Sequence, residues 1–600
     1  MSHRMSAPRL LAAATLAALI PAGDAAACGC FTPPDPASPI VQSGERIIFA
    51  AFGNQITSII QIQYSGDAKD FGWLLPLPSL PTLELSSDEI FSQLESSTAP
   101  TYVRHTTWDY TNCQFQGGPG GASDLGSPFD AGMNGGGGGP GDPLVIQGGI
   151  GPYDYAVLKA DDKTAMFDWL TKNRYFVPVG TTDVVGPYLH TGAYFLALKL
   201  QSGKSTGDLQ PVVVRYNSDL PMIPITLTSV TATPAMNVWV WILGDGRAIP
   251  RNYYHAVIDD AALQYGFPTF SDSPAYNYSD VVLNAVQSAP RKQAFVTELA
   301  QPMKKIKSTV FPSNQFGDLA ALAKLTGAGD YLRYLRNNGY IFSQNLVTIL
   351  QKYIKQPAML RGQFGQPVPQ PSPANYYFNF DYWFMNNQQA FQGFDLSFDQ
   401  AALTAEINTK IVKPIRDAAA LFDGYAYLTR LYTRLDPTDM NRDPVFSFNP
   451  FLPDVTNYHR AELRLGCDKP QQWSGTLTTA DGYTIPYPNG SQPFPYPKLP
   501  GARRIEILRE AGQPDVVTDN DALIRMLLAQ PMPDGGVPIV DAGVPGKDSG
   551  VADAGSPGAK SNDSAFCSLS PGSAGNGSGM GLVLIGMAVV GIVRRRRRNQ

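Results

Sequence analysis

Alternating apolar and polar residues predict β-strands in the first half of the chain. Within the run 56–64, Ile60 and Ile62 flank Gln61, so one face of the expected strand is buried and the other is polar. The strands expected from such runs cover residues 44–52, 56–64, 71–77, 153–158, 194–200, 212–216, 223–227 and 238–243. With two helices among them, these runs predict an N-terminal α/β part with a mixed sheet at 28–290.

Helical periodicity dominates after about Lys292. An earlier helix is predicted by Ser86 as its N-cap, with Glu89 three residues later, which is the arrangement of a capping box. The later elements expected are helices at 161–170, 319–325, 331–335, 346–354, 401–431 (interrupted by Pro414) and 521–528 (capped by Asp519 or Asn520), and strands at 461–465 and 505–508. The predicted fold class is therefore α+β (mixed), with a more helical middle and C-terminal part at 291–530.

Two segments contain too few large apolar side chains to form a core. Residues 116–149 are rich in glycine and include five consecutive glycines, and residues 531–575 are rich in Pro, Gly and Asp. Chains of such composition bury too little surface to offset the entropy lost on ordering. We expect a disordered insertion at 116–149 and a disordered stalk at 531–575.

Both ends of the chain carry targeting features. At the N-terminus, basic residues precede the apolar run 10–20 and a small-residue cleavage site, as in a signal peptide at 1–27. At the C-terminus, residues 576–593 are predicted to form a single transmembrane helix, and the basic tail 594–600 is expected on the cytoplasmic side. The arginines that flank this anchor are Arg594, Arg595, Arg596, Arg597 and Arg598. We therefore predict an exported protein of the cell envelope, anchored in the membrane or displayed at the cell surface.

Four of the five cysteines lie in the body of the chain. Cys28 and Cys30 are separated by one glycine, too close for a comfortable mutual bridge, so each is expected to reach Cys113 or Cys467. Export to an oxidising compartment favours two disulfides from this set. Lipidation of Cys28 is not favoured, because an alanine stands three residues before it where lipoproteins usually have leucine. Cys567, beside the anchor, is a candidate for sorting or lipidation.

The charge distribution argues against nucleic acid as a partner. The chain has 600 residues with 46 Lys and Arg and 51 Asp and Glu, and the basic groups are concentrated at the two targeting ends. The body between them is more acidic than the whole chain, and it lacks a basic stripe interleaved with aromatic residues. The expected partners are the membrane, through the anchor, and an unidentified envelope or extracellular ligand.

The sequence contains no motif for catalysis or metal binding. The histidines outside the signal are His105, His190, His255 and His459. Their spacing is unlike that of zinc hydrolases, and no Gly-x-Ser-x-Gly motif occurs. The carboxylate pairs are Asp161 with Asp162, Asp259 with Asp260, and Asp436 near Asp439. Helix N-termini explain the first two pairs and a turn explains the third, so we predict no catalytic residue, no metal and no cofactor.

Aromatic residues are dense between positions 376 and 384. The segment contains Tyr376, Tyr377, Phe378, Phe380, Tyr382, Trp383 and Phe384. We expect core packing with tyrosine hydroxyls at the rim. The alternative is an exposed face that stacks on sugar rings or anchors a partner.

Two parts of the chain resemble known families. The tail, with Cys567, a short glycine-containing apolar helix and an arginine block, resembles the myxobacterial C-terminal sorting signal, which implies recognition at the membrane, cleavage near the cysteine and surface display. The body, over most of residues 28–530, resembles the bacterial family called domain of unknown function 2330. The residues that carry this likeness are Cys28-Gly29-Cys30, Gly44-Glu45-Arg46, Asp70-Phe71-Gly72-Trp73, Pro76-Leu77-Pro78, Trp169-Leu170 near Asn173, Tyr427-Leu428-Thr429-Arg430-Leu431-Tyr432 and Asp443-Pro444. That family has no assigned catalytic residues, so the resemblance implies no activity.

Two functions of different class therefore stay open. The favoured one is a non-enzymatic envelope or surface module that binds a ligand or has a structural role, because the chain combines an anchor and a stalk with no catalytic motif. The alternative is an extracellular hydrolase of a polymeric substrate that uses paired carboxylates.

Overall fold

The protein is described here by a computed structural model. The described residues are 41–65, 72–109, 144–173, 184–201, 209–265, 277–361, 367–368, 370–469, 472–487 and 498–529. The predicted signal peptide, stalk, transmembrane helix and basic tail lie outside these ranges, as do Cys28, Cys30, Cys113 and Cys567.

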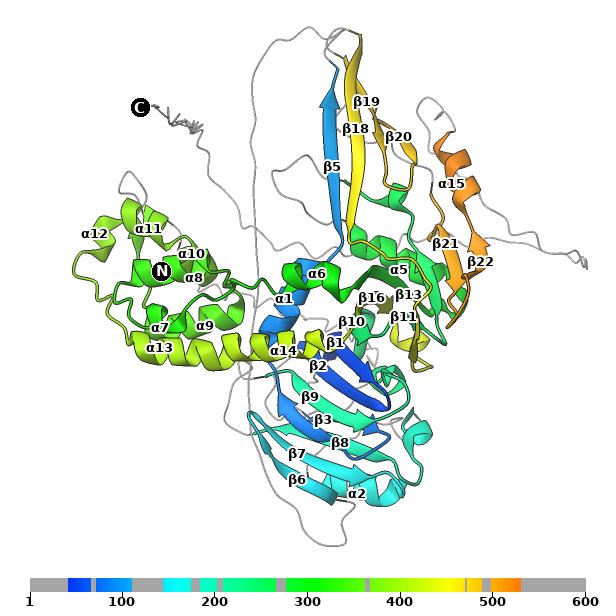
Figure 1. Cartoon of the computed structure of the whole chain (residues 1–600), viewed down its shortest axis with the longest axis horizontal. Coiled ribbons are helices and arrows are strands. Elements are labelled where there is room, and N and C mark those ends of the chain that lie inside the picture. The colour runs from blue at the N-terminus through cyan, green and yellow to red at the C-terminus, as the bar shows by residue number, and fades with distance from the viewer. Residues whose placement is uncertain are drawn as a thin grey trace, which may run out of the picture. The chain divides into compact units, whose positions relative to one another are not determined.

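Within the described residues, ten strands form one sheet in the order β22-β21-β12-β13-β16-β10-β1-β2-β9-β4 (Figure 1). Their bounds are β1 (Val41–Phe52), β2 (Gln55–Ser65), β4 (Thr82–Leu85), β9 (Val212–Asn217), β10 (Ala232–Gly244), β12 (Tyr254–Val257), β13 (Ala294–Pro302), β16 (Tyr427–Leu435), β21 (Arg504–Ile507) and β22 (Asp515–Asp519). Neighbouring strands of this ten-stranded sheet are antiparallel except for the parallel pairs β1–β10 and β12–β13. Strands from both sides of residue 290 are hydrogen-bonded neighbours in this sheet, so the two predicted parts share one framework.

Two four-stranded sheets accompany the large sheet, in the orders β3-β8-β7-β6 and β20-β19-β18-β5 within the described chain. Their bounds are β3 (Gly72–Leu77), β5 (Thr101–Trp108), β6 (Leu144–Ile150), β7 (Tyr153–Lys159), β8 (Tyr194–Leu200), β18 (Tyr458–Lys469), β19 (Gln472–Thr478) and β20 (Thr484–Tyr487). Short pairs are formed by β11 (Arg247–Pro250) with β17 (Phe446–Asn449) and by β14 (Leu360–Arg361) with β15 (Pro367–Val368).

Helices between residues 303 and 423 pack together, joined by α1 from earlier in the chain (Figure 1). The α-helices are α1 (Asp88–Thr98), α2 (Lys163–Lys172), α4 (Ile225–Thr228), α5 (Tyr278–Ser288), α6 (Met303–Val310), α7 (Leu319–Leu322), α8 (Ala328–Asn337), α9 (Gln344–Tyr353), α10 (Pro373–Phe378), α11 (Phe380–Asn386), α12 (Gln388–Phe391), α13 (Gln400–Ile407), α14 (Lys413–Asp423) and α15 (Asp521–Leu528). Short helical turns cover Gly186–Tyr188, Asp260–Ala262, Pro290–Lys292, Asn408–Val412 and Pro437–Asp439. Sheets and helices together confirm the predicted mixed α+β class.

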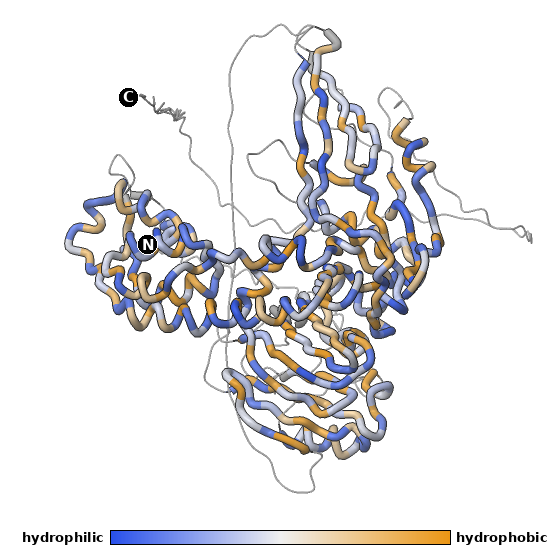
Figure 2. The backbone as a smooth tube through the Cα atoms, in the orientation of Figure 1, coloured by the Kyte–Doolittle hydropathy of each residue, from blue (hydrophilic) through white to orange (hydrophobic). Residues whose placement is uncertain are grey.

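Strand β1 shows how the large sheet supports two cores. Ile47 and Phe49 point to the core shared with β3 and β8, whereas Ile48 and Ala50 point to the core formed with the helices. Successive side chains of a strand alternate between faces, so one strand contributes to both cores. Figure 2 shows hydrophobic and hydrophilic positions interleaved along these strands.

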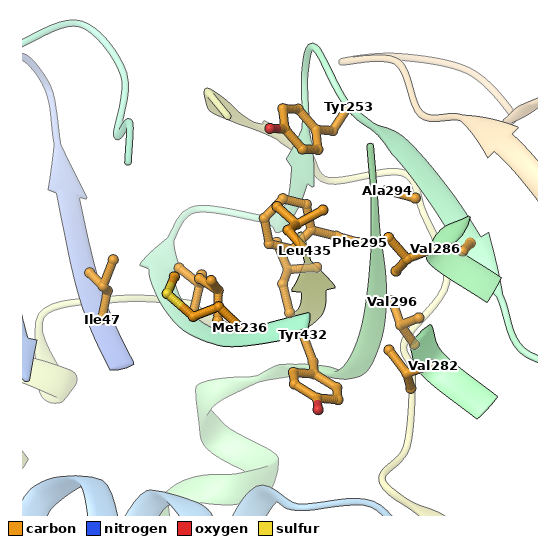
Figure 3. Packing of buried hydrophobic residues seen from close by; sticks show 14 of the residues in the cluster. Ile47, Met236, Tyr253, Val282, Val286, Ala294, Phe295, Val296, Tyr432 and Leu435 are labelled. Atoms are coloured by element: carbon orange, nitrogen blue, oxygen red, sulfur yellow. The ribbon is translucent and has the colours of Figure 1, made fainter. Parts of the chain in front are cut away.

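Helix α5 packs against β13 in the first of these cores. In Figure 3, Val282 and Val286 of α5 lie beside Ala294 and Val296. The side chain of Phe295 points toward Tyr253, and the centroids of these two rings are 5.5 Å apart. The apolar residues of α5 recur at a spacing of three and four, which places them on one helical face.

A buried ion cluster lies between α1 and the sheet. Arg430 of β16 donates from Nε to Glu298 at 2.5 Å and from a terminal nitrogen to Glu95 at 2.8 Å. Its guanidinium carbon also lies 5.0 Å from the ring centroid of Trp241, and the Tyr278 hydroxyl donates to the second Glu298 oxygen at 2.7 Å. Burial opposes the charge of Arg430, but Glu298 and Glu95 hold its pKa above its ordinary value.

Three local predictions were wrong. The N-cap of α1 is Ser87 rather than Ser86, and its hydroxyl accepts from the Glu89 N–H at 3.4 Å. Residues 223–227 do not form a strand, because Ile225–Thr228 form the short helix α4 with Pro224 at its N-cap. The end of the expected disordered insertion, from Leu144 onward, forms β6 and pairs with β7.

The predicted helix 401–431 is also too long. Helix α14 ends at Asp423, and the following Tyr427–Leu435 is the central strand β16. The predicted interruption at Pro414 is present, because a π-helical turn precedes it and Pro414 lies in the first turn of α14. β16 was misread because it is buried on both faces, which removes the alternation typical of a strand.

The aromatic segment 376–384 is divided between core and surface. Tyr376, Tyr377 and Phe380 are buried, as expected for core packing. Phe378, Tyr382 and Phe384 are exposed by 45%, 57% and 41%. The segment therefore packs through one face of α10 and α11 and leaves the other uncovered within the described chain.

Among the helices of the described residues, none is both long enough and apolar enough to cross a bilayer. The predicted anchor at 576–593 lies outside this part of the chain and stays a prediction.

Candidate functional site

A cavity of about 510 Å³ opens where β11, β12, β13 and β21 meet. We call it the basin, and we define it by Arg247, His255, Thr297, Arg504, Glu506 and His459. Several of these side chains are charged or polar yet buried, which is unusual without partners or function.

Strand pairing explains why three of these residues meet. His255 on β12 lies opposite Glu506 on the antiparallel neighbour β21. On the other side, β12 runs parallel to β13 and pairs His255 with Phe295, two residues before Thr297. The distance from His255 Nδ1 to Glu506 Oε2 is 3.1 Å, and the distance from His255 Nε2 to Thr297 Oγ1 is 3.0 Å.

We call the hydrogen-bonded residues Glu506, His255 and Thr297 the relay. The hydrogen bonds between them determine which atoms carry protons. Ionised Glu506 only accepts hydrogen bonds, so His255 carries its proton on Nδ1 and its Nε2 accepts from the Thr297 hydroxyl. Burial lowers the pKa of His255, the Glu506 hydrogen bond opposes this, and the nearby Arg247 charge lowers it further. Burial raises the pKa of Glu506, but His255, Arg504 and Arg247 together hold it below its ordinary value. At neutral pH the relay therefore consists of a carboxylate, a neutral imidazole and a hydroxyl.

Two arginines border the relay. Arg247 donates to Thr297 Oγ1 at 3.2 Å and to the Pro453 carbonyl at 3.1 Å. Arg504 forms an ion pair with the other oxygen of Glu506 at 3.2 Å. Among the described residues, neither Arg247 Nε nor Arg504 Nε has a hydrogen-bond partner. Unpaired buried donors of this kind suggest a ligand or ion that completes them.

The lining of the basin also includes an acid and an aromatic pair. Asp260 accepts from the Thr479 hydroxyl and from the Asp481 N–H, both at 2.9 Å. Burial, with the nearby Asp481 charge, raises the pKa of Asp260 to about 7. The rings of Tyr102 and His459 are stacked with centroids 4.7 Å apart. The basin thus combines an acid and aromatic rings with two arginines.

The sequence-predicted carboxylate pairs have structural roles, with one exception. Asp162 caps α2 by accepting from Ala165 N–H at 3.0 Å, and Asp259 accepts from Ala261 N–H at 2.9 Å. Asp436 accepts from the Ala235 N–H at 2.8 Å. Of these residues only Asp260 lines the basin, and its carboxylate there accepts from the Thr479 hydroxyl and from the Asp481 backbone N–H.

Of the four histidines, the structure brings His255 and His459 to the basin and leaves the other two elsewhere. His105 pairs with exposed Glu462 at 2.9 Å, and exposed His190 lies beside the Thr191 carbonyl. Sequence reasoning missed the relay, because Thr297 and Glu506 lie 42 and 251 residues from His255. Within the described residues, no group of three or more His, Cys, Asp or Glu is placed to hold a metal ion.

Cys467 is buried in β18 and is disulfide-bonded. The parallel strand β5 pairs Trp108 with Leu465, and the Asp109 N–H donates to the Leu465 carbonyl at 2.8 Å. The other four cysteines lie outside the described residues, so the partner of Cys467 stays a prediction.

Comparison with known proteins places part of the chain beside an uncharacterised family. Residues 22–311 match the model of the family described as "Uncharacterized protein conserved in bacteria (DUF2330)". The match supports the predicted likeness for this part of the chain, and it ends before Tyr427–Tyr432 and Asp443, where the likeness stays a prediction. No curated protein and no solved structure matches the chain. The class defined so far is thus a mixed α+β protein similar to a bacterial family without an assigned activity.

Proposed function

We propose that this chain is an exported envelope protein whose body acts as a binding module, with the basin as its site for a small carboxylate-bearing ligand. The observation that carries the ligand class is the pair of guanidinium groups, Arg247 and Arg504, whose Nε atoms have no partner in the described chain. Arginine is well suited to planar anions, because its donors match the geometry of a carboxylate.

The acidic residues of the basin leave the Nε atoms of Arg247 and Arg504 available to a ligand. Asp260 is engaged by Thr479 and Asp481, and Glu298 is engaged by Arg430. Glu506 takes one nitrogen of Arg504 and leaves Nε unpaired. A volume of about 510 Å³ lies in the range of small-molecule sites.

A binding experiment tests the ligand class. We expect acetate, succinate or benzoate to bind the mature protein in calorimetric titrations, and Arg504→Met to weaken binding by roughly tenfold or more, since a hydrogen bond to a charged group contributes about 1.5–3 kcal/mol. Arg509→Met is the matched control, because Arg509 is exposed, pairs with Asp515 and lies outside the basin. If Arg504→Met and Arg509→Met bound these carboxylates with equal affinity, the carboxylate site would lie outside the basin, which would contradict the proposal.

Export is supported by the N-terminal signal pattern, the Pro/Gly/Asp-rich segment and the basic C-terminal end. Peptide mass spectrometry of protein from cell envelopes tests it together with the disulfide. We expect an unlipidated N-terminus at Cys28, loss of the arginine tail, and a Cys467 peptide that is bridged to another cysteine and separates on reduction. A chain beginning at Met1 with free thiols would contradict export. A free thiol at Cys467 would contradict the disulfide.

The relay supports acyl hydrolysis as a second candidate function. A hydroxyl bonded to a neutral imidazole that is itself oriented by a carboxylate is the arrangement of an activated nucleophile. Thr297 would be the nucleophile, His255 the base and Glu506 the orienting group. The binding module is preferred, because Thr297 lies buried within a strand and its oxygen already accepts from Arg247. Covalent labelling of Thr297 by a fluorophosphonate would reverse this preference.

A further inference from the structure

A second cavity, of about 370 Å³, lies over β1, β2 and β9 and is covered by β3 and the turn at Gly186–Tyr188. We call it the acid pocket and define it by Glu45, Phe49, Ser58, Tyr188, Tyr216 and Asp443. Most of its remaining lining is apolar, including Ile47 and Leu75. It shares no lining residue with the basin.

Glu45 is a buried acid for which the described residues provide no ion-pair partner. It occupies the face of β1 that carries Ile47 and Phe49, and its strand neighbours are Val238 on β10 and Ile62 on β2. Its exposed fraction is 3%, and its Oε2 has no hydrogen-bond partner. Within the described residues no ion pair to this carboxyl group occurs either. A charge in such a place is costly unless something from outside compensates it.

The second carboxyl group of the pocket behaves differently. Asp443 accepts from the Tyr188 hydroxyl at 2.7 Å and from the Thr226 N–H at 2.9 Å. Each oxygen of Asp443 therefore already accepts from a donor of the protein itself. Glu45 is therefore the acid that is available to a ligand.

The other titratable groups around the pocket do not neutralise Glu45. They are Tyr188, His190, Tyr216 and Asp443, and among the described residues no lysine or arginine lines the cavity. The Tyr216 hydroxyl is engaged with Ser58 at 3.3 Å, and His190 is exposed. Burial alone raises the pKa of Glu45 to about 7.

We propose that the acid pocket binds a small organic cation, an ammonium group with an apolar substituent, whose charge pairs with Glu45. The aromatic residues Phe49, Tyr188 and Tyr216 favour a cation, because the face of an aromatic ring is electronegative. The apolar lining from β1 and β3 receives the substituent, and the volume suits a small molecule. The inference is independent of the basin and its ligand.

Calorimetric titration of the mature protein with benzyltrimethylammonium tests the proposal, because this probe is charged at every pH. We expect roughly tenfold or more tighter binding at pH 8 than at pH 5.5, since the carboxyl group must ionise to pair with the probe. At pH 6.5, binding should release roughly three quarters of a proton, measured by comparing buffers of different ionisation enthalpy. Benzyl alcohol, the neutral comparison, should bind weakly and without this pH dependence.

Glu45→Gln should reduce the affinity for benzyltrimethylammonium at pH 8 at least tenfold and abolish the proton release. Glu84→Gln is the matched control, because Glu84 is exposed on β4 and pairs with Arg215. A cooperative thermal unfolding transition of Glu45→Gln at a temperature no lower than that of the parent at pH 8 would confirm that the pocket is intact. The proposal is overturned if the probe fails to bind or if Glu45→Gln binds it as tightly as the parent protein does. It is also overturned if the parent protein releases no proton on binding, a measurement that needs no variant.

Discussion

Replacing Arg430 with methionine is expected to lower the free energy of unfolding by about 3–5 kcal/mol, the range measured when one partner of a buried ion pair is removed. The side chain of Arg430 is 1% exposed, as is that of Glu298, to which it donates at 2.5 Å. Methionine fills a similar volume but carries no charge. Glu298 would then remain buried with only the Tyr278 hydroxyl as a partner.

Arg434→Met is the matched control, because Arg434 lies on the same strand and also pairs with an acid. Its partner Asp280 is 72% exposed, so this pair contributes only about 0–1 kcal/mol. Urea unfolding followed by circular dichroism measures both changes. Adding Glu298→Gln to Arg430→Met should recover part of the lost stability, because no charge is then left unpaired. A loss below about 1 kcal/mol for Arg430→Met would show that Arg430 is not needed to compensate Glu298.

The sequence pattern predicts best those strands that have one polar face or clear turns at both ends. Strand β8 was expected at 194–200 and has those bounds, and β1 and β2 were expected within a few residues of their ends. Here each local pattern agrees with the tertiary environment, so short-range information is sufficient.

Strands β13 and β16 were missed for one physical reason. Both lie inside the large sheet and are buried on both faces, so neither shows a polar alternate position. In β16 the polar residues Thr429, Arg430 and Thr433 find partners inside the protein, and such partners are invisible in the sequence. A sequence reader sees regular leucines and tyrosines there and infers a helix.

The basin could not have been predicted from spacing, because β12 acquires its neighbours β13 and β21 only through the tertiary fold. Glu45 was different, since a signal for it existed. In the run 44–52 it stands in phase with Ile47 and Phe49, on the side expected to be buried. A charged residue in phase with a buried face is the sequence signature of a functional or compensated acid.

Glu45 is also expected to make the stability of the protein depend on pH. Burial raises its pKa from 4.5 to about 7, so the folded protein binds a proton more tightly than the unfolded chain between these values. The contribution of Glu45 to the free energy of unfolding is therefore fully present below pH 4.5 and is lost as the pH rises through 7. Because each pKa unit corresponds to about 1.4 kcal/mol, the loss amounts to about 3 kcal/mol at pH 8.

Glu45→Gln removes the charge while it keeps the shape of the side chain. Relative to the parent protein, the variant should gain about 3 kcal/mol between pH 4.5 and pH 8, measured as the difference in unfolding free energy at the two values. Glu89 and Asp260, whose pKa values burial also raises to about 7, contribute equally to parent and variant and cancel in this comparison. Glu84→Gln should show no such gain, because Glu84 is exposed. A saturating organic cation should remove the difference, since it compensates the ionised carboxylate that glutamine eliminates. If the variant and the parent lose stability in parallel as the pH rises, Glu45 is not the group that titrates.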